Sequence, residues 1–333
     1  MTVTGVFSTS RRIALGGLIA FPLLATFGSA TVLAQAYPTK SVRIILPFGA
    51  GGVADVTTRL VADKLGEKMG QRFVVENTPG AGGIAAARAT IAGGNDGYTI
   101  ALLTNGTAIS VPLFKALPFD PLKDFTPISS IGYFDIIFVA NKDSPYKTLQ
   151  DFIKAAKASP GKLNVGTIAP GSTQHLTSQL FKSMAGLDYV NVTFRTTGEA
   201  MVALLRNDVQ MVVEFYAGVR SQLTEGKAIG LAWSGPKPSA VLPNVPTVAQ
   251  SGVAGFEVVS WNGFYAPTGT PPAVINALNS ALQTVLADAD IKKKALENGI
   301  DTRASTPAEL DARMKADIAK WTAVIEKAGI AKQ

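Results

Sequence analysis

The chain has 333 residues, of which 47% are hydrophobic and 17% charged, so it is long enough for two domains with separate cores. It has no cysteine and one histidine, His175, which excludes disulfide scaffolds, thiol chemistry, thiolate metal sites and multi-histidine zinc sites. The 31 basic and 24 acidic residues are scattered, without a basic run, so their balance favours small anionic ligands over nucleic acid.

The first 36 residues have the pattern of an export signal. Arg11 and Arg12 form a positive start, an apolar stretch covers 13–27, and Ala34-Gln35-Ala36 has the small-x-small pattern of a cleavage site. The apolar stretch is too short and interrupted for a comfortable membrane span. We expect cleavage after Ala36, a mature chain that starts at Tyr37, and a periplasmic location. The arginine pair leaves both the Sec and the twin-arginine routes open.

From residue 41 the chain alternates strand and helix signals, which is typical of parallel α/β units. An apolar run at 41–47 precedes a glycine-rich turn and a helix at about 55–69. Further strands are expected at 72–76, 98–104 and 131–140, the last after a proline-rich passage.

A second α/β set follows residue 148. Strands are expected at 163–167, 190–194, 209–215 and 229–233, with helices between them. A proline-rich connector at 236–246 leads to another strand at 258–266.

The remaining residues predict an all-helical tail. Its last helix begins at the capping box Thr306-Pro307-Ala308-Glu309, and the apolar residues Leu310, Met314 and Trp321 recur on one face. Because so amphipathic a helix must pack on a core, we expect it to cover the first domain, which would then be discontinuous.

Three expected strands end in turns rich in Gly, Ser and Thr that open helices, at 48–55, 104–108 and 167–173. Ligands of parallel sheets bind at the carboxyl ends of strands, where helix N-termini present unpaired N–H groups. The alternative is that each turn only connects and caps. The first turn also fits a dinucleotide pattern, but Asp55 would place a carboxylate beside the pyrophosphate, so we disfavour it.

Four side chains near these turns have two interpretations each. His175 either bonds the backbone or contacts a ligand, and Ser172 is an N-cap or, with His175, part of a hydrolase site, although no G-x-S-x-G elbow is present. Arg195, after the strand at 190–194, is the best-placed cation for a carboxylate, or else a solvated charge. Glu214 either lines the cleft or starts the next helix.

Together these segments resemble a known family. PTKSVRIILPFGAGGVADVTTRLVADKL, ENTPGAGGIAAARA, DGYTIAL, LPFDPLKDFTPIS, PGKLNVGT, LPNVPTVAQSG and APTGTPPAVINALN are similar to segments of the Bug-type receptors. These receptors are the extracytoplasmic solute-binding components of tripartite tricarboxylate transporters. The resemblance covers 37–330 and implies an α/β type II periplasmic-binding-protein fold. The expected lobes, with a ligand cleft between them, are 37–139 with 262–333, and 140–261.

The resemblance implies a small carboxylate ligand: a di- or tricarboxylate, an acidic amino acid or an aromatic acid. It places the first and third turns, and the turn at 104–108, around that carboxylate. With Arg195 and Glu214 added, the candidate ligand-binding residues are Phe48, Gly49, Ala50, Gly51, Gly52, Asp55, Thr104, Asn105, Gly106, Thr107, Ala108, Thr167, Ala169, Gly171, Ser172, Thr173, His175, Arg195 and Glu214. The family's usual proline is Ala50 here, and its usual aspartate is Glu214, so the identity of the ligand does not carry over.

The predicted function is therefore that of a receptor that closes over a carboxylate and delivers it to a membrane permease. We expect a monomer with no catalytic residues, metal, cofactor or nucleic-acid partner. The alternatives are a secreted hydrolase using Ser172 and His175, and a ligand-binding partner of a membrane sensor kinase.

Overall fold

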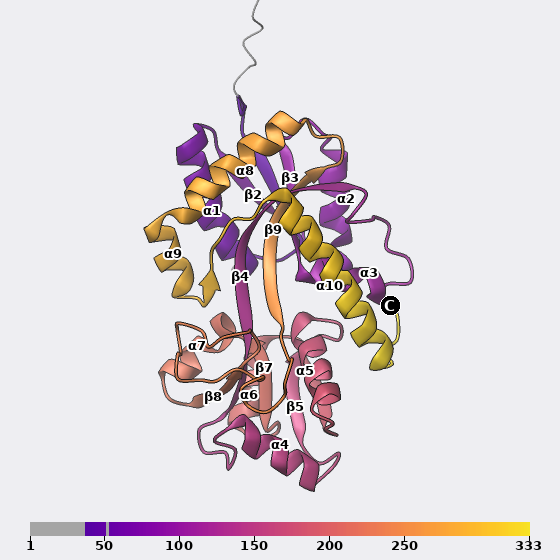
Figure 1. Ribbon diagram of the computed structural model, residues 1–333, viewed down its shortest axis with the longest axis vertical. Coiled ribbons are helices and arrows are strands. Elements are labelled where there is room, and N and C mark those ends of the chain that lie inside the picture. Colours follow the sequence, from indigo (N-terminus) through magenta and orange to yellow (C-terminus); the bar gives the residue numbers. More distant parts are fainter. Residues whose placement is uncertain (1–36, 51–52) are drawn as a thin grey trace, which may run out of the picture. The chain divides into compact units, whose positions relative to one another are not determined.

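A computed structural model describes residues 37–50 and 53–333 (Figure 1). The predicted export signal with its cleavage after Ala36, and the candidate residues Gly51 and Gly52, lie outside the described residues. No helix in the described part of the chain is both long and apolar enough to cross a membrane.

The first sheet has the strand order β2-β1-β3-β9-β4. Strand β1 pairs in parallel with β2 and β3, whereas β9 runs antiparallel to both β3 and β4. Its strands are β1 (Val42–Leu46), β2 (Phe73–Asn77), β3 (Thr99–Thr104), β4 (Phe125–Asn141) and β9 (Val259–Pro267). The helices connected to it are α1 (Val53–Met69), η1 (Ala81–Gly83), α2 (Ile84–Ala92) and α3 (Asn105–Leu113).

The second sheet repeats this plan, with β7 and β8 on either side of the far half of β4. Strand β5 pairs in parallel with β6 and β7, and β4 is antiparallel to its neighbours. Its other strands are β5 (Asn164–Ile168), β6 (Val190–Phe194), β7 (Met211–Phe215) and β8 (Ala228–Trp233). The helices are α4 (Leu149–Ala158), α5 (Thr173–Met184), α6 (Thr197–Leu205) and α7 (Tyr216–Thr224). The described residues thus form two α/β lobes, as predicted.

Strand β4 belongs to both sheets and runs from one to the other (Figure 1). It pairs with β9 as far as Asp135 and with β7 from Ile136 onward. The predicted strand at 131–140 is too short, because β4 starts at Phe125 despite Pro127. A shift in register beside Pro127 accommodates the missing N–H group of that residue.

The tail contains the helices α8 (Pro272–Ala287), α9 (Ala289–Leu296) and α10 (Pro307–Lys327). The prediction that it is all-helical is wrong at one place, because β10 (Ile300–Asp301) adds two residues to the edge of β4. Helix α10 has the predicted capping box at Thr306 and packs against α3 and β4. It also contacts α5 of the other lobe, which was not expected.

Candidate functional site

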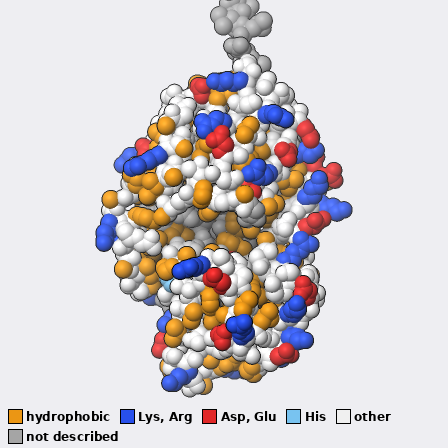
Figure 2. All heavy atoms as spheres, turned by 180° about the vertical axis from the view of Figure 1, so that it is seen from behind, with side chains coloured by type: hydrophobic (Ala, Val, Ile, Leu, Met, Phe, Trp, Pro, Cys, Tyr) orange, Lys and Arg blue, Asp and Glu red, His pale blue; other side chains and the backbone are white. Residues whose placement is uncertain are grey.

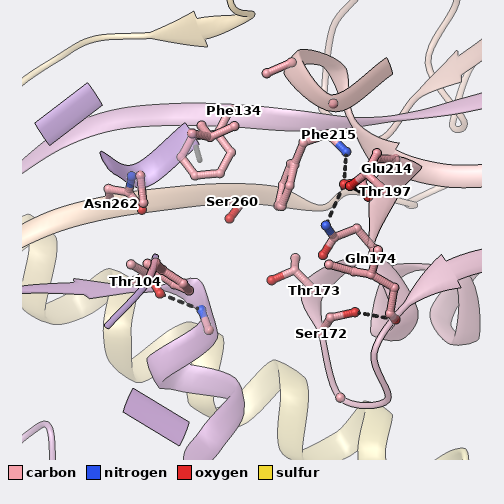
Figure 3. A pocket seen from close by; sticks show the side chains of 18 residues that line it. Thr104, Phe134, Ser172, Thr173, Gln174, Thr197, Glu214, Phe215, Ser260 and Asn262 are labelled. Carbon is pink, nitrogen blue, oxygen red and sulfur yellow. Dashed lines mark hydrogen bonds between the residues drawn. The ribbon is translucent and has the colours of Figure 1, made fainter. Parts of the chain in front are cut away.

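A cavity of about 470 Å³ lies where strands of both sheets end and the next helices begin (Figure 3). Strands β3, β5 and β7 each end at it, and the long strands β4 and β9 pass beside it. Its lining residues are Phe48, Val53, Ala54, Thr104, Gly106, Phe134, Ile168, Gly171, Ser172, Thr173, Gln174, Thr197, Glu214, Phe215, Ala217, Gly218, Ser260 and Asn262. The face of the molecule shown in Figure 2 has a hollow bordered by hydrophobic side chains.

Five helices direct their first turns at this cavity. They are represented by Ala54 in α1, Gly106 in α3, Gln174 in α5, Thr197 in α6 and Gly218 in α7. The first N–H groups of a helix have no acceptor inside it, and the helix dipole adds positive potential there. None of the described lining residues has a cationic side chain, so in the described part of the wall the groups suited to an anion are the N–H groups at these helix ends.

The caps of these helices differ. Thr104 caps α3, since its Oγ1 accepts from the Gly106 N–H at 3.0 Å and its own N–H donates to Thr107 Oγ1 at 3.1 Å. Ser172 caps α5 by accepting from the His175 N–H at 3.1 Å. No side chain caps α7, so its first-turn N–H groups, including that of Gly218, are left for another acceptor.

Aromatic side chains form the apolar part of the wall. Phe134 from β4 and Phe215 at the end of β7 meet edge to face, with ring centroids 5.1 Å apart. Phe48, which follows β1, is 40% exposed. The cavity can therefore hold an apolar or aromatic ligand body beside its polar ends.

Glu214 is the one acidic side chain among the described lining residues, and it is only 2% exposed. Its carboxylate accepts from Gln174 Nε2 at 2.6 Å, from the Phe215 N–H at 2.7 Å and from Thr197 Oγ1 at 2.8 Å. Burial raises the pKa of Glu214, and these three hydrogen bonds oppose that rise.

Asn262 in β9 is 1% exposed, and its Nδ2 has no hydrogen-bond partner in the described part of the chain. A buried donor without an acceptor costs about 1–3 kcal/mol. Because Asn262 lines the cavity, a ligand oxygen can remove this cost (Figure 3).

The candidates from the sequence divide into two groups. Seven line the cavity: Phe48, Thr104, Gly106, Gly171, Ser172, Thr173 and Glu214. The other described candidates are outside the lining: Gly49, Ala50, Asp55, Asn105, Thr107, Ala108, Thr167, Ala169, His175 and Arg195.

Two of the second group support the site from behind. Asp55 Oδ1 accepts from Asn77 Nδ2 at 2.9 Å, and the same Nδ2 donates to the Phe48 carbonyl at 3.0 Å, so this pair holds the first turn against β2. Asn105 accepts from Trp321 Nε1 at 2.8 Å and donates to Thr173 Oγ1 at 3.2 Å. This chain of bonds links α10, α3 and α5.

Arg195 lies away from the cavity, contrary to the expectation that it is the best-placed cation. It is exposed at the end of β6, the edge strand of its sheet, and its backbone N–H donates to Glu199 Oε2 at 3.0 Å. The turn after β6 does reach the cavity, but through Thr197 at the start of α6 and not through Arg195.

Ser172 and His175 do not form a nucleophile–base pair. Ser172 Oγ donates to the Ile168 carbonyl at 3.0 Å, while His175 Nδ1 accepts from the Gly171 N–H at 3.1 Å. Burial lowers the pKa of His175. The hydroxyl and the imidazole thus have separate structural partners, and these two side chains do not have the geometry of a hydrolase pair.

Several lining residues were not among the candidates. Thr197, Ala217 and Gly218 follow the carboxyl ends of strands. Ligands of parallel sheets bind at such ends, so the same argument that predicted the other turns would also have predicted these residues. Phe134 lies within β4 and Ser260 and Asn262 lie within β9, and no local signal in the sequence marks them. Within residues 37–50 and 53–333, no group of three acidic or histidine side chains could hold a metal ion.

Comparison with known proteins agrees with this arrangement. The family model described as "Tripartite tricarboxylate transporter family receptor" matches residues 57–330. Protein BugT of Bordetella pertussis is 30% identical over 309 residues, which are 92% of this chain and 95% of that protein.

Two solved structures from Rhodopseudomonas palustris are similar. Rpa4515 with adipate is 32% identical with a TM-score of 0.79, over 89% of this chain and 99% of that one. MatC with bound malate is 29% identical with a TM-score of 0.74, over 87% of this chain and 100% of that one. Since the family match covers most of the sequence and the two-lobed fold agrees with it, the chain belongs to the tripartite tricarboxylate transporter receptor family, whose members are periplasmic binding proteins and not enzymes.

Proposed function

We propose that this protein captures a small carboxylate in the cavity between its lobes and delivers it to the membrane components of a tripartite transporter. The observation that carries the proposal is the set of five helix N-termini around one cavity that has no cation in its described lining. Such donors bind a carboxylate through backbone N–H groups and fixed dipoles.

The moving parts are the lobes 37–139 with 262–333, and 140–261. The cavity has walls from both, since Thr104 and Asn262 belong to the first lobe and Thr173 and Glu214 to the second. Closure around a ligand is the usual motion of two lobes joined by strands. A ligand that contacts both walls favours the closed state, because only there are all its bonds made.

The related structures support an acid as ligand. Rpa4515 was solved with adipate and MatC with malate, and both proteins match this chain over nearly their whole length. Adipate and malate differ in length and in hydroxylation, so they favour the carboxylate class without selecting one compound.

Binding is tested by calorimetry and thermal shift on the mature protein with mono-, di- and tricarboxylates and amino acids. At 100 times Kd a ligand adds about 2.7 kcal/mol of stability. Methyl esters of the acids that bind are the matched controls, and we expect them to bind much more weakly. If no acid binds, or if esters bind as well as acids, the carboxylate proposal is rejected.

Delivery and export need separate tests. Uptake of the bound acid should be lost in cells without the receptor and restored by its expression.

We also propose export with cleavage after Ala36, which predicts Tyr37 as the N-terminus of the mature protein in mass spectrometry. A mature protein that keeps Arg11 and Arg12 would contradict this.

A further inference from the structure

The cavity has two chemically different ends (Figure 3). Asn262, Thr104 and Phe134 lie on one side of the view, while Glu214, Gln174 and Thr197 lie on the other. The first end belongs to β9, β3 and β4, and the second to β7 and the starts of α5 and α6.

The Asn262 end offers donors. The Asn262 amide has no partner for its Nδ2 in the described residues, and it lies on β9, which pairs with the end of β3 at Thr104. Helix α3 begins directly after Thr104, with Gly106 on the cavity. A carboxylate placed here gains the amide bond and the field of the helix.

The Glu214 end already contains a carboxylate. Gln174 Nε2, Thr197 Oγ1 and the Phe215 N–H are donors suited to a ligand carboxylate, yet all three donate to Glu214. Two of these bonds are at Oε1 and one is at Oε2, so an acceptor position remains on Oε2.

Glu214 also affects the uncapped helix α7. It directly precedes Phe215, the N-cap of that helix, so its negative charge lies beside the positive helix end. A second ligand carboxylate near α7 would therefore meet a buried carboxylate at close range, which is unfavourable in surroundings of low polarity.

Building on the proposed function, we propose that Glu214 acts as a built-in anion that selects the ligand: a small monocarboxylate with a hydrogen-bond donor at its far end. The ligand carboxylate lies toward Asn262, and its hydroxyl or ammonium group donates to Glu214. The body between them contacts Phe134 and Phe215. A dicarboxylate of equal length is disfavoured, because its second carboxylate replaces a donor with a second anion.

The test uses probes with the same number of carbon atoms that differ only at the far end: 4-aminobutyrate, 4-hydroxybutyrate, butyrate and succinate, and the aromatic pair 4-(hydroxymethyl)benzoate and terephthalate. Calorimetry on the wild type should show donor-bearing acids binding at least about tenfold more tightly than the dicarboxylate of their series, a difference of about 1.4 kcal/mol. Succinate or terephthalate binding as tightly as its partner would overturn the inference while leaving the carboxylate receptor intact. Failure of every acid, including those of the wider screen, would instead reject the proposed function.

Glu214→Gln should reduce this donor preference at least about tenfold, because it removes the charge and keeps the shape. Its matched control is Glu225→Gln, the same change at an exposed glutamate after the far end of α7, which should leave the preference unchanged. An unchanged preference in Glu214→Gln, or an equal change in the control, contradicts the inference. If Glu214→Gln does not fold, Glu214→Asp keeps the negative charge at this end of the cavity. In that variant the dicarboxylates must remain disfavoured against the donor-bearing acids, and equal binding of the two classes would contradict the inference.

Asn262→Asp tests the orientation of the ligand. It places an anion where the ligand carboxylate is expected, so it should weaken all carboxylates together and leave the donor preference in place. If Asn262→Asp instead changes only the preference between succinate and 4-hydroxybutyrate, the ligand binds in the opposite orientation. That result would overturn the assignment of the two ends.

Discussion

Asp135 is a carboxylate at the point where β4 leaves the first sheet for the second. It borders a further cavity of about 390 Å³, with Lys237, Asp301 and Arg303 around it. Burial, and then the neighbouring carboxylates of Asp301 and Glu257, raise the pKa of Asp135 to about 6, while Lys237 and Arg303 lower it. This residue therefore makes the junction of the lobes sensitive to pH.

The folded protein holds the Asp135 proton more tightly than the unfolded chain, whose carboxyl has the ordinary pKa of 3.8. Between about pH 4 and pH 6 this contribution to the free energy of unfolding falls as pH rises, by up to about 3 kcal/mol. Asp135→Asn should remove this slope and be more stable than the wild type at pH 7. Urea unfolding at several pH values measures it.

Asp143→Asn, at an exposed position just after β4, is the control and should retain the wild-type slope. Parallel profiles of Asp135→Asn and the wild type would contradict the prediction.

At the scale of the element, the same kind of cap serves different purposes in α3 and α10. Thr104 and Thr306 are both N-caps with capping boxes, but only Thr104 lines the cavity. Thr306 pairs with Glu309 on the surface. The two helices thus allow the stability of a helix to be separated from the binding of a ligand.

Thr104→Ala and Thr306→Ala should each lower the free energy of unfolding by about 1 kcal/mol, because each leaves a helix N–H without its acceptor. Only Thr104→Ala should weaken ligand binding as well, since it alters a helix end in the cavity. Denaturant unfolding and calorimetry on both variants check this. Weaker binding in Thr306→Ala would show that binding follows stability alone.

Helix α10 also joins the lobes through Trp321. Its indole N–H bonds to the oxygen of Asn105, which is buried and itself bonds to Thr173 of α5. Trp321→Phe leaves that oxygen without a donor and should cost about 1–3 kcal/mol in unfolding free energy. Lys315→Ala, on the exposed side of α10, should cost far less, and equal losses in urea unfolding would contradict a specific role of the indole.

For the whole molecule, the path of the chain predicts a change of shape on binding. Strand β4 carries the chain from one sheet to the other, and it returns through Val258 and β9, where the Val258 N–H bonds to the Ser234 carbonyl. Because only a few segments of this kind connect the lobes, each lobe can rotate as a rigid body relative to the other.

A confirmed ligand should therefore decrease the radius of gyration measured by small-angle scattering. An unchanged radius with saturating ligand would contradict closure. A carboxylate that does not bind serves as the control, and it should leave the scattering curve as it is.

The sequence by itself determined the α/β class, the helix caps and most of the turns that reach the cavity. These features depend on neighbours along the chain: Thr104 and Ser172 cap helices because of residues two or three positions away. The three Gly/Ser/Thr turns were therefore found from their position after strands. The predicted lobe boundaries at 139/140 and 261/262, and the predicted site as a set, stay predictions.

Only the tertiary structure decided which side chains meet in the cavity. Phe134, Ser260 and Asn262 lie within strands, where the sequence shows only that a strand is present, and the antiparallel pairing of β4 with β9 brings them to the wall. Arg195 also follows a strand end, but Thr197, two residues further along the same turn, is the residue that lines the cavity. Glu214 received its three donors from α5, α6 and its own turn, up to 40 residues away in the chain. Strand order is a long-range property, and neither composition nor spacing along the chain contains it.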